Sequence, residues 1–139
     1  MDSLEDAIGD FSDLIGNILE ETIDRSVFSD LTQKQLYYLK VIVRMKNPTV
    51  TILARELCLS KPTITVLLDK LEEKGYIVRF RSEEDRRVVY IQADKKAERI
   101  NELMKTAYGK IAEKIKSGLN KEETLLFTGF LKKVAEHSN

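Results

Sequence analysis

The sequence predicts a mainly α-helical fold with one small β-hairpin, and three observations support this. Apolar residues recur every three or four positions through most of the chain, which is the period of amphipathic helices. Residues 76–92 depart from this period, because they are rich in β-branched and aromatic side chains around a polar turn. Short polar residues that cap helices precede five of the predicted helices. These caps are Thr32, Thr49, Ser60, Asp94 and Asn120.

The composition is that of one ordinary soluble domain that can bury its own core. The chain has 139 residues, of which 42% are hydrophobic and 33% charged. No apolar run approaches the ~20 residues of a membrane span, and the acidic N-terminus does not resemble a signal peptide. A single cysteine, Cys58, excludes an intrachain disulfide and agrees with a reducing compartment. We therefore expect a cytoplasmic protein.

The formal net charge of +0 hides a strong asymmetry along the chain. Residues 1–30 hold nine acidic residues against Arg25 alone, a net charge of −8, so residues 31–139 carry +8. This asymmetry fits a basic surface placed away from an acidic one, although a solvated acidic helix face explains it equally well.

The predicted helices begin with an amphipathic segment at about 3–24, whose apolar stripe includes Leu4, Ile8 and Phe11. A second helix starts at a capping box formed by Thr32 and Gln35 and runs to about residue 45. Asn47 and Pro48 end it.

Two shorter helices follow with the spacing of a helix-turn-helix. Thr49 caps the first, which runs through residue 57 and contains the small Ala54 that permits close approach of the second helix. Cys58 and Leu59 form the turn. Ser60 caps the second helix, which ends near residue 75.

The hairpin comprises residues 76–81 and 87–92, with the polar turn 82–86 between them. Asp94 then caps a long helix that ends at Gly118, and Asn120 with Glu123 starts the last helix. Residues 31–93 thus form a predicted winged helix-turn-helix lobe that binds DNA.

Residues 1–30 and 94–139 are apolar-striped helices without a compact domain of their own. An apolar stripe must be buried somewhere, and the simplest solution is packing between two chains, which makes these segments dimerisation helices. The alternative is that they fold back on the lobe of their own chain.

The helix that starts at Ser60 has the features of a recognition helix. Four apolar residues face inward at helical spacing, and the opposite side is free to enter a major groove of DNA. We expect the hydroxyls of Thr63 and Thr65 and the charge of Lys61 to contact DNA, and Pro62 and Val66 could contact a thymine methyl group. The predicted DNA-binding residues of this helix are Ser60, Lys61, Pro62, Thr63, Thr65, Val66 and Lys70.

The tip of the hairpin supplies a second predicted DNA contact at Asp85, Arg86 and Arg87. An Asp two positions before an Arg on a tight turn can hold the guanidinium in a fixed direction. An arginine aimed in this way suits the narrow, negative minor groove.

The run from Leu53 to Arg79, continued by Asp85, Arg86 and Arg87, resembles the MarR family of bacterial and archaeal regulators. The resemblance implies a dimer held by the first and last two helices, a recognition helix from Ser60 in the major groove, and Arg87 in the minor groove. It also implies that Arg86 touches the DNA backbone.

The sequence departs from the family pattern in three respects. Many members have an arginine at the position of Val66, so we expect specificity to depend on Lys61, Thr63 and Thr65. Ala93 and Asp94 replace a common Leu-Thr pair, and Asp caps a helix as well as Thr does. Cys58 stands where a glycine or a similar turn residue is usual.

The resemblance further implies a small-molecule site for an aromatic or phenolic effector, in a crevice between the dimer helices and the DNA-binding lobe. Its candidate residues are Tyr37, Tyr38, Arg99 and Tyr108. Each of these residues is also of a type that serves in a core, at a boundary or on a solvated surface.

Other chemistry finds little support in the sequence. There is no phosphate-binding glycine loop and no Ser–His or Cys–His pair for catalysis, and one histidine (His137) with one cysteine makes a zinc site improbable. We expect no cofactor and no enzymatic activity, and Cys58 to be a structural thiol rather than a redox sensor.

The predicted function is that of a homodimeric regulator, expected to act as a repressor that binds a near-palindromic operator in double-stranded DNA. The alternative is a winged-helix protein-interaction module within a transcription complex, whose wing would present exposed apolar residues.

Overall fold

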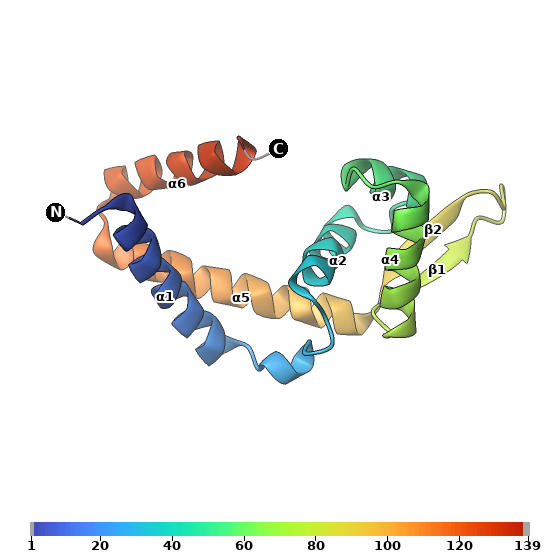
Figure 1. The fold of residues 1–139 in the computed structure, drawn as a ribbon, viewed down its shortest axis with the longest axis horizontal. Helices are drawn as coiled ribbons and strands as arrows, with labels where there is room; N and C mark the ends of the chain where they lie inside the picture. The colour runs from blue at the N-terminus through green and yellow to red at the C-terminus, as the bar shows by residue number, and fades with distance from the viewer. Residues whose placement is uncertain (1, 138–139) are drawn as a thin grey trace. The chain divides into compact units, whose positions relative to one another are not determined.

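The computed structural model describes residues 2–137, which form six α-helices, one 3₁₀ turn and a two-stranded antiparallel hairpin (Figure 1). The elements in chain order are α1 (Leu4–Thr22), η1 (Arg25–Val27), α2 (Gln33–Met45), α3 (Val50–Glu56), α4 (Lys61–Glu73), β1 (Ile77–Arg81), β2 (Val89–Ala93), α5 (Lys95–Gly118) and α6 (Lys121–Glu136). The predicted fold class, mainly helical with a small β-wing, is confirmed.

The chain divides into two compact units. One comprises Asp24–Met104 and holds α2, α3, α4 and the hairpin; the other comprises Met1–Ile23 and Lys105–Asn139. Helix α5 contributes its first part to the former unit and its remainder to the latter. The assignment of 31–93 to DNA binding and of 1–30 and 94–139 to dimerisation concerns function, and remains a prediction.

The predicted capping boxes form as expected. Thr32 Oγ1 accepts a hydrogen bond from the backbone N–H of Gln35, and the Gln35 side chain accepts one from the N–H of Thr32. Asn120 and Glu123 make the same reciprocal pair at the start of α6. Asp94 accepts a hydrogen bond from the N–H of Lys96 in the first turn of α5. Each pair satisfies N–H groups that a helix start leaves without intrahelical partners.

The core of the Asp24–Met104 unit is built by all of its helices and both strands. Its largest fully buried side chains, each less than 2% exposed, are Leu39, Ile42, Leu53, Ile64, Leu68, Leu71, Tyr76, Ile77, Ile91 and Ile100. Three of these residues belong to the inner face of α4. Their burial fixes which side of this helix is turned outward.

The hairpin is shorter than the sequence predicts. Strand β1 pairs with β2 from Ile77 opposite Ala93 to Arg81 opposite Val89, whereas the sequence pattern placed the second strand from residue 87. Residues 85–88 form a turn instead, because the N–H of Val88 donates to the carbonyl oxygen of Asp85 and the N–H of Arg87 to its carboxylate. Arg87 therefore lies in the loop and not in a strand.

A polar cluster ties the segment before α2 to the end of α4. The hydroxyl of the buried Tyr76 donates a 2.5 Å hydrogen bond to the carboxylate of Asp30. The Lys74 ammonium donates to the Asp30 carbonyl and, at 3.2 Å, to Gln35, and the Lys96 ammonium lies 4.2 Å from the centre of the Tyr76 ring. The hydrogen bond from Tyr76 lowers the pKa of Asp30, and burial together with this bond raises the pKa of Tyr76.

Replacing Tyr76 by phenylalanine should lower the free energy of unfolding at pH 7 by about 1–2 kcal/mol, the contribution of a hydrogen bond to a charged group that is partly exposed to water. The pKa of Asp30 is lowered in the folded state, so this contribution is present above its ordinary value of 3.8 and is lost as the pH falls through the lowered pKa. Urea titrations at pH 7 and pH 3 measure both effects. The Tyr90→Phe variant is the control, and an equal loss there would contradict the assignment.

Candidate nucleic-acid interface

Helices α3 and α4 form the predicted helix-turn-helix. Ser60 caps α4 by accepting a hydrogen bond from the N–H of Thr63 at 3.3 Å, and Pro62 lies in the first turn, where a missing N–H costs nothing. Gly75 follows α4 with a φ of 83°, in the left-handed region that glycine adopts without strain. The start and the end of the recognition helix are therefore as predicted.

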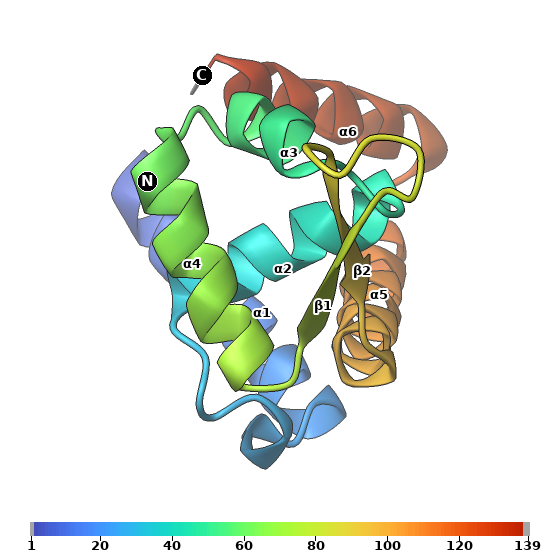
Figure 2. The same ribbon diagram turned by 90° about the vertical axis from the view of Figure 1, so that its right-hand side faces the viewer.

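The outward face of α4 carries all of the helix residues predicted to contact DNA. In Figure 2, one side of α4 faces the rest of its unit and the other faces outward. Ser60, Lys61, Pro62, Thr63, Thr65, Val66 and Lys70 are all exposed. Their exposure agrees with a role at a surface, and their contact with DNA remains a prediction.

The hydroxyl groups on this face are already engaged within α4. Ser60 Oγ donates to Thr63 Oγ1 at 2.8 Å, and Thr65 Oγ1 donates to the carbonyl oxygen of Lys61 at 2.9 Å. Thr65 therefore keeps only its acceptor capacity for a ligand, while Thr63 can still donate its own proton.

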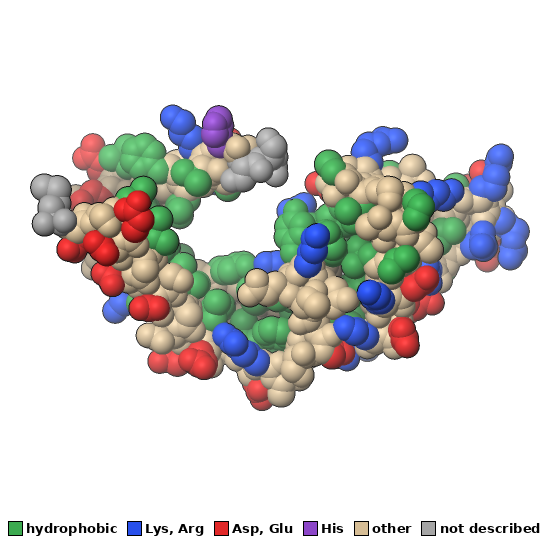
Figure 3. Space-filling model, viewed as in Figure 1, with side chains coloured by type: hydrophobic (Ala, Val, Ile, Leu, Met, Phe, Trp, Pro, Cys, Tyr) green, Lys and Arg blue, Asp and Glu red, His purple; other side chains and the backbone are tan. Residues whose placement is uncertain are grey.

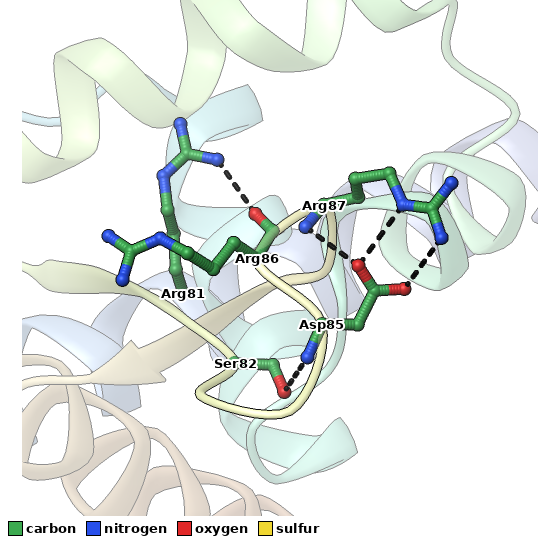
Figure 4. Close-up of polar contacts among 5 residues, drawn as sticks. All are labelled: Arg81, Ser82, Asp85, Arg86 and Arg87. Atoms are coloured by element: carbon green, nitrogen blue, oxygen red, sulfur yellow. Dashed lines mark hydrogen bonds and ion pairs between the residues drawn. The ribbon is translucent and has the colours of Figure 1, made fainter.

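The wing tip is held by a compact set of hydrogen bonds (Figure 4). Arg81 reaches across the loop to donate to the carbonyl oxygen of Arg86 at 2.9 Å, and the N–H of Asp85 donates to Ser82 Oγ at 3.3 Å. The guanidinium groups of Arg86 and Arg87 point to opposite sides of this loop. The sequence singled out Arg86 and Arg87 but not the bracing role of Arg81.

Asp85 orients Arg87, as the sequence predicts. Its carboxylate accepts from the Arg87 backbone N–H and from Nε, both at 3.1 Å, and from Nη2 at 3.4 Å. These bonds lower the pKa of Asp85 from its ordinary value of 3.8. The Arg87 side chain is nonetheless 92% exposed, and this combination of exposure with a fixed direction is what a wing contact requires.

Arg79 links the wing to the recognition helix, and sequence reasoning missed it. Its guanidinium donates to Asp69 at 2.6 Å and to Glu72 at 2.8 Å, joining β1 to α4. Both acids lie on a helix expected to approach phosphates, where uncompensated carboxylates would be repelled. Arg79 could have been found from the alternation of side chains along β1, which puts it on the same face of the strand as the buried Ile77.

Charge is distributed in keeping with a basic lobe. Residues 31–93 hold 12 Lys and Arg residues against seven acidic ones, a net charge of +5. Figure 3 shows Lys and Arg side chains gathered at the wing tip and acidic side chains along α1. Within residues 2–137, no cluster of metal-ligating side chains occurs and no helix could cross a membrane.

Comparison with known proteins identifies the family. The family model described as "MarR family" matches residues 31–89. The crystal structure of Streptococcus pneumoniae FabT in complex with DNA is 30% identical to this chain, with a TM-score of 0.74, over 97% of this chain and 96% of that one. The chain belongs to the MarR family. Members of this family are DNA-binding transcriptional regulators and not enzymes.

Two further relatives show how widely the similarity extends. Staphylococcus aureus MepR bound to ethidium bromide shares the fold, with 20% identity and a TM-score of 0.73 over 99% of this chain and 98% of that one. The HTH-type transcriptional regulator FarR of Neisseria gonorrhoeae is 24% identical over 108 residues, which are 78% of this chain and 74% of that protein.

The departure from the MarR pattern at Cys58 has a backbone basis. Cys58 is exposed and has a φ of 54°, the left-handed conformation that glycine adopts most readily. The turn between α3 and α4 thus keeps the geometry that a glycine would supply.

Two of the four candidate effector residues lie next to each other. Tyr37 and Tyr38 lie side by side on α2, with ring centroids 5.7 Å apart, and Arg99 is exposed on α5 in the same unit. Tyr108 belongs to the other unit. An effector site at these residues remains a prediction.

Proposed function

We propose that this MarR-family chain acts as a homodimer that binds a near-palindromic operator in duplex DNA and represses transcription, with a small ligand modulating its affinity. The observation that carries the proposal is the pairing, within one compact unit, of an exposed recognition helix and a wing arginine that Asp85 holds in place. The complex of FabT with DNA supports the same role for this chain.

Dimerisation is supported by apolar side chains that the single chain leaves exposed. No residue of α1 or α6 is buried, although both helices carry apolar stripes. The exposed large residues of these two helices are Leu4, Ile8, Leu125, Leu126, Phe130, Leu131 and Val134. A patch of this composition is typical of a surface that a partner covers, and a second copy of the chain is the partner that a two-fold operator requires.

A ligand would act by its preference between dimer shapes. If it binds better to a dimer whose recognition helices have the wrong separation for two half-sites, it weakens DNA binding. Bound DNA then weakens ligand binding by the same factor. The complex of MepR with ethidium supports an aromatic ligand for a protein of this fold.

The alternative, a protein-interaction module, is less well supported by the wing. The exposed large hydrophobic residues of the hairpin, Val78 and Phe80, lie on β1, whereas the tip presents Arg86 and Arg87. A cationic tip suits a polyanion better than an apolar protein surface.

Selection of bound fragments from the genomic DNA of the source organism tests the proposal. Purified chain should enrich fragments that share a two-fold sequence whose half-sites are about one helical turn apart. If the bound fragments share no sequence more often than a random pool of fragments does, sequence-specific binding is rejected.

Lys61 should contribute mainly through phosphate. The Lys61→Ala variant should bind operator and unrelated duplex more weakly by a similar factor. The magnitude of the slope of log affinity against log salt should fall by about one for each phosphate contact that is lost. Fluorescence anisotropy at several salt concentrations measures both. A variant that loses affinity for the operator alone would instead make Lys61 a base reader.

A further inference from the structure

The outermost stripe of α4 has an unusual composition for a helix that reads DNA. Residues opposite the buried Ile64, Leu67, Leu68 and Leu71 project furthest outward, and at about 100° per residue these are Pro62, Val66, Asp69 and Glu73. All four are exposed, and Val66 is 53% exposed. The leading turn and a half of the helix therefore presents an apolar pair at the centre of its outward face.

Three of the side chains that most often recognise bases, arginine, asparagine and glutamine, are missing from this helix. Arginine reads guanine and asparagine or glutamine reads adenine through paired hydrogen bonds. Helix α4, Lys61–Glu73, contains none of these three residue types. Lys61 and Lys70 flank the stripe and can reach phosphates, which position a protein without identifying the sequence.

The remaining polar groups are partly withdrawn from base recognition. The hydroxyl of Thr65 donates a hydrogen bond to the carbonyl oxygen of Lys61, and Thr63 Oγ1 accepts a hydrogen bond from Ser60. Asp69, the first acid of the stripe, is held 2.6 Å from Arg79. In the leading part of the helix, what remains accessible at the centre of the face is the side chain of Pro62 and that of Val66, one turn further along, whereas Glu73 is the last residue of α4.

We propose that Pro62 and Val66 form an apolar ridge that recognises the 5-methyl groups of thymine, and that Val66 is the main specificity-determining residue of the recognition helix. This inference rests on the proposed function, because it names the base feature that the same helix reads. Residues four apart on a helix have Cβ atoms about 5–6 Å apart. The ridge therefore spans one to two base steps of about 3.4 Å. The operator half-site contains thymine at the contacted positions.

Deoxyuridine substitution tests the proposal, because deoxyuridine differs from thymidine only by the missing methyl group. In the operator recovered from genomic DNA, each thymine is replaced singly and affinity is measured by anisotropy. At least one position should weaken binding of the wild-type protein about four-fold, which corresponds to about 0.8 kcal/mol for one buried methyl group. If no replacement weakens binding by more than two-fold, the proposal is overturned.

The Val66→Ala variant assigns the contact. It should bind the unmodified operator about 16-fold more weakly, because both protomers of the dimer lose the contact that a single deoxyuridine removes once. It should also lose its sensitivity to deoxyuridine at that position, since the methyl group has lost its partner. Alanine favours an exposed helix position, so the fold should be retained, as circular dichroism can show. Undiminished sensitivity in Val66→Ala would remove the residue from its assigned role.

Val78→Ala is the matched control, because Val78 is a valine with 50% exposure on β1 rather than on α4. It should keep both the wild-type affinity and the deoxyuridine sensitivity. Loss of the sensitivity in this variant as well would overturn the assignment to α4. Failure of the proposed function is distinguishable, because a protein that selects no operator shows no sequence-specific binding at all.

Discussion

Replacing Arg87 by alanine should weaken operator binding by about 1–3 kcal/mol, or roughly 5–150-fold. Arg87 is 92% exposed and hydrogen-bonded to Asp85 through both its backbone and its side chain. The arginine is thus held in one direction before DNA arrives, and the entropy cost of ordering it on binding is reduced. Because a narrow minor groove concentrates negative potential, removing the cation there should lower operator affinity strongly.

Two further variants separate the contact from its orientation. Asp85→Ala should lose less affinity than Arg87→Ala, because the cation is kept while its fixed direction is lost, at about 0.5–1.5 kcal/mol. Arg25→Ala, which removes an exposed arginine from the acidic N-terminal region, should leave affinity unchanged. Operator titrations at constant salt compare the three, and an Arg87→Ala variant with wild-type affinity would remove the wing from the interface.

Replacing Phe130 by aspartate should dissociate the proposed dimer. Phe130 is 60% exposed in the single chain and lies on the apolar stripe of α6. An aromatic residue at the centre of an interface is commonly worth about 2 kcal/mol or more, and a two-fold dimer contains two copies. We therefore expect the dimer dissociation constant to rise by roughly 1,000-fold. Operator affinity should fall with it, because a monomer reaches only one half-site.

Thr128→Asp is the control for charge. It adds the same negative charge to α6 at a position about 160° around the helix from Phe130. Sedimentation equilibrium should show a monomer for Phe130→Asp and a dimer for Thr128→Asp and for the wild type. A wild-type chain that sediments as a monomer of 16.0 kDa at micromolar concentration would contradict the dimer itself.

Features that depend on near neighbours in the chain could be predicted from the sequence. The capping boxes at Thr32 and Asn120 and the pairing of Asp85 with Arg87 join residues two or three positions apart. Their geometry follows from helix and turn stereochemistry alone. The inward face of α4 was equally predictable, because its apolar residues follow the helical period.

Features that depend on distant residues could not be predicted. The hydrogen bond from Tyr76 to Asp30 joins positions 46 apart, and Arg79 meets Asp69 across two different elements. Propensity does not encode such encounters, because they arise only when the elements pack. The second strand was predicted two residues too early for a related reason, since Asp85 competes for the backbone N–H groups of the loop.

The hydroxyls of Thr63 and Thr65 illustrate how packing changes a functional reading. Both were expected to contribute to specificity through free hydroxyl groups. The structure shows each engaged with a neighbour in the first turns of α4. We therefore expect Val66, rather than the two threonines, to contribute most to the specificity of the recognition helix.

The composition of the protein–DNA complex tests the central claim most directly. Native mass spectrometry of the chain with the duplex recovered from genomic DNA should show two chains, each of 16.0 kDa, bound to one duplex. A duplex that keeps one half-site and scrambles the other should bind much more weakly. One chain per duplex, or equal binding of a fully scrambled duplex of the same length, would contradict a homodimer that reads a two-fold operator.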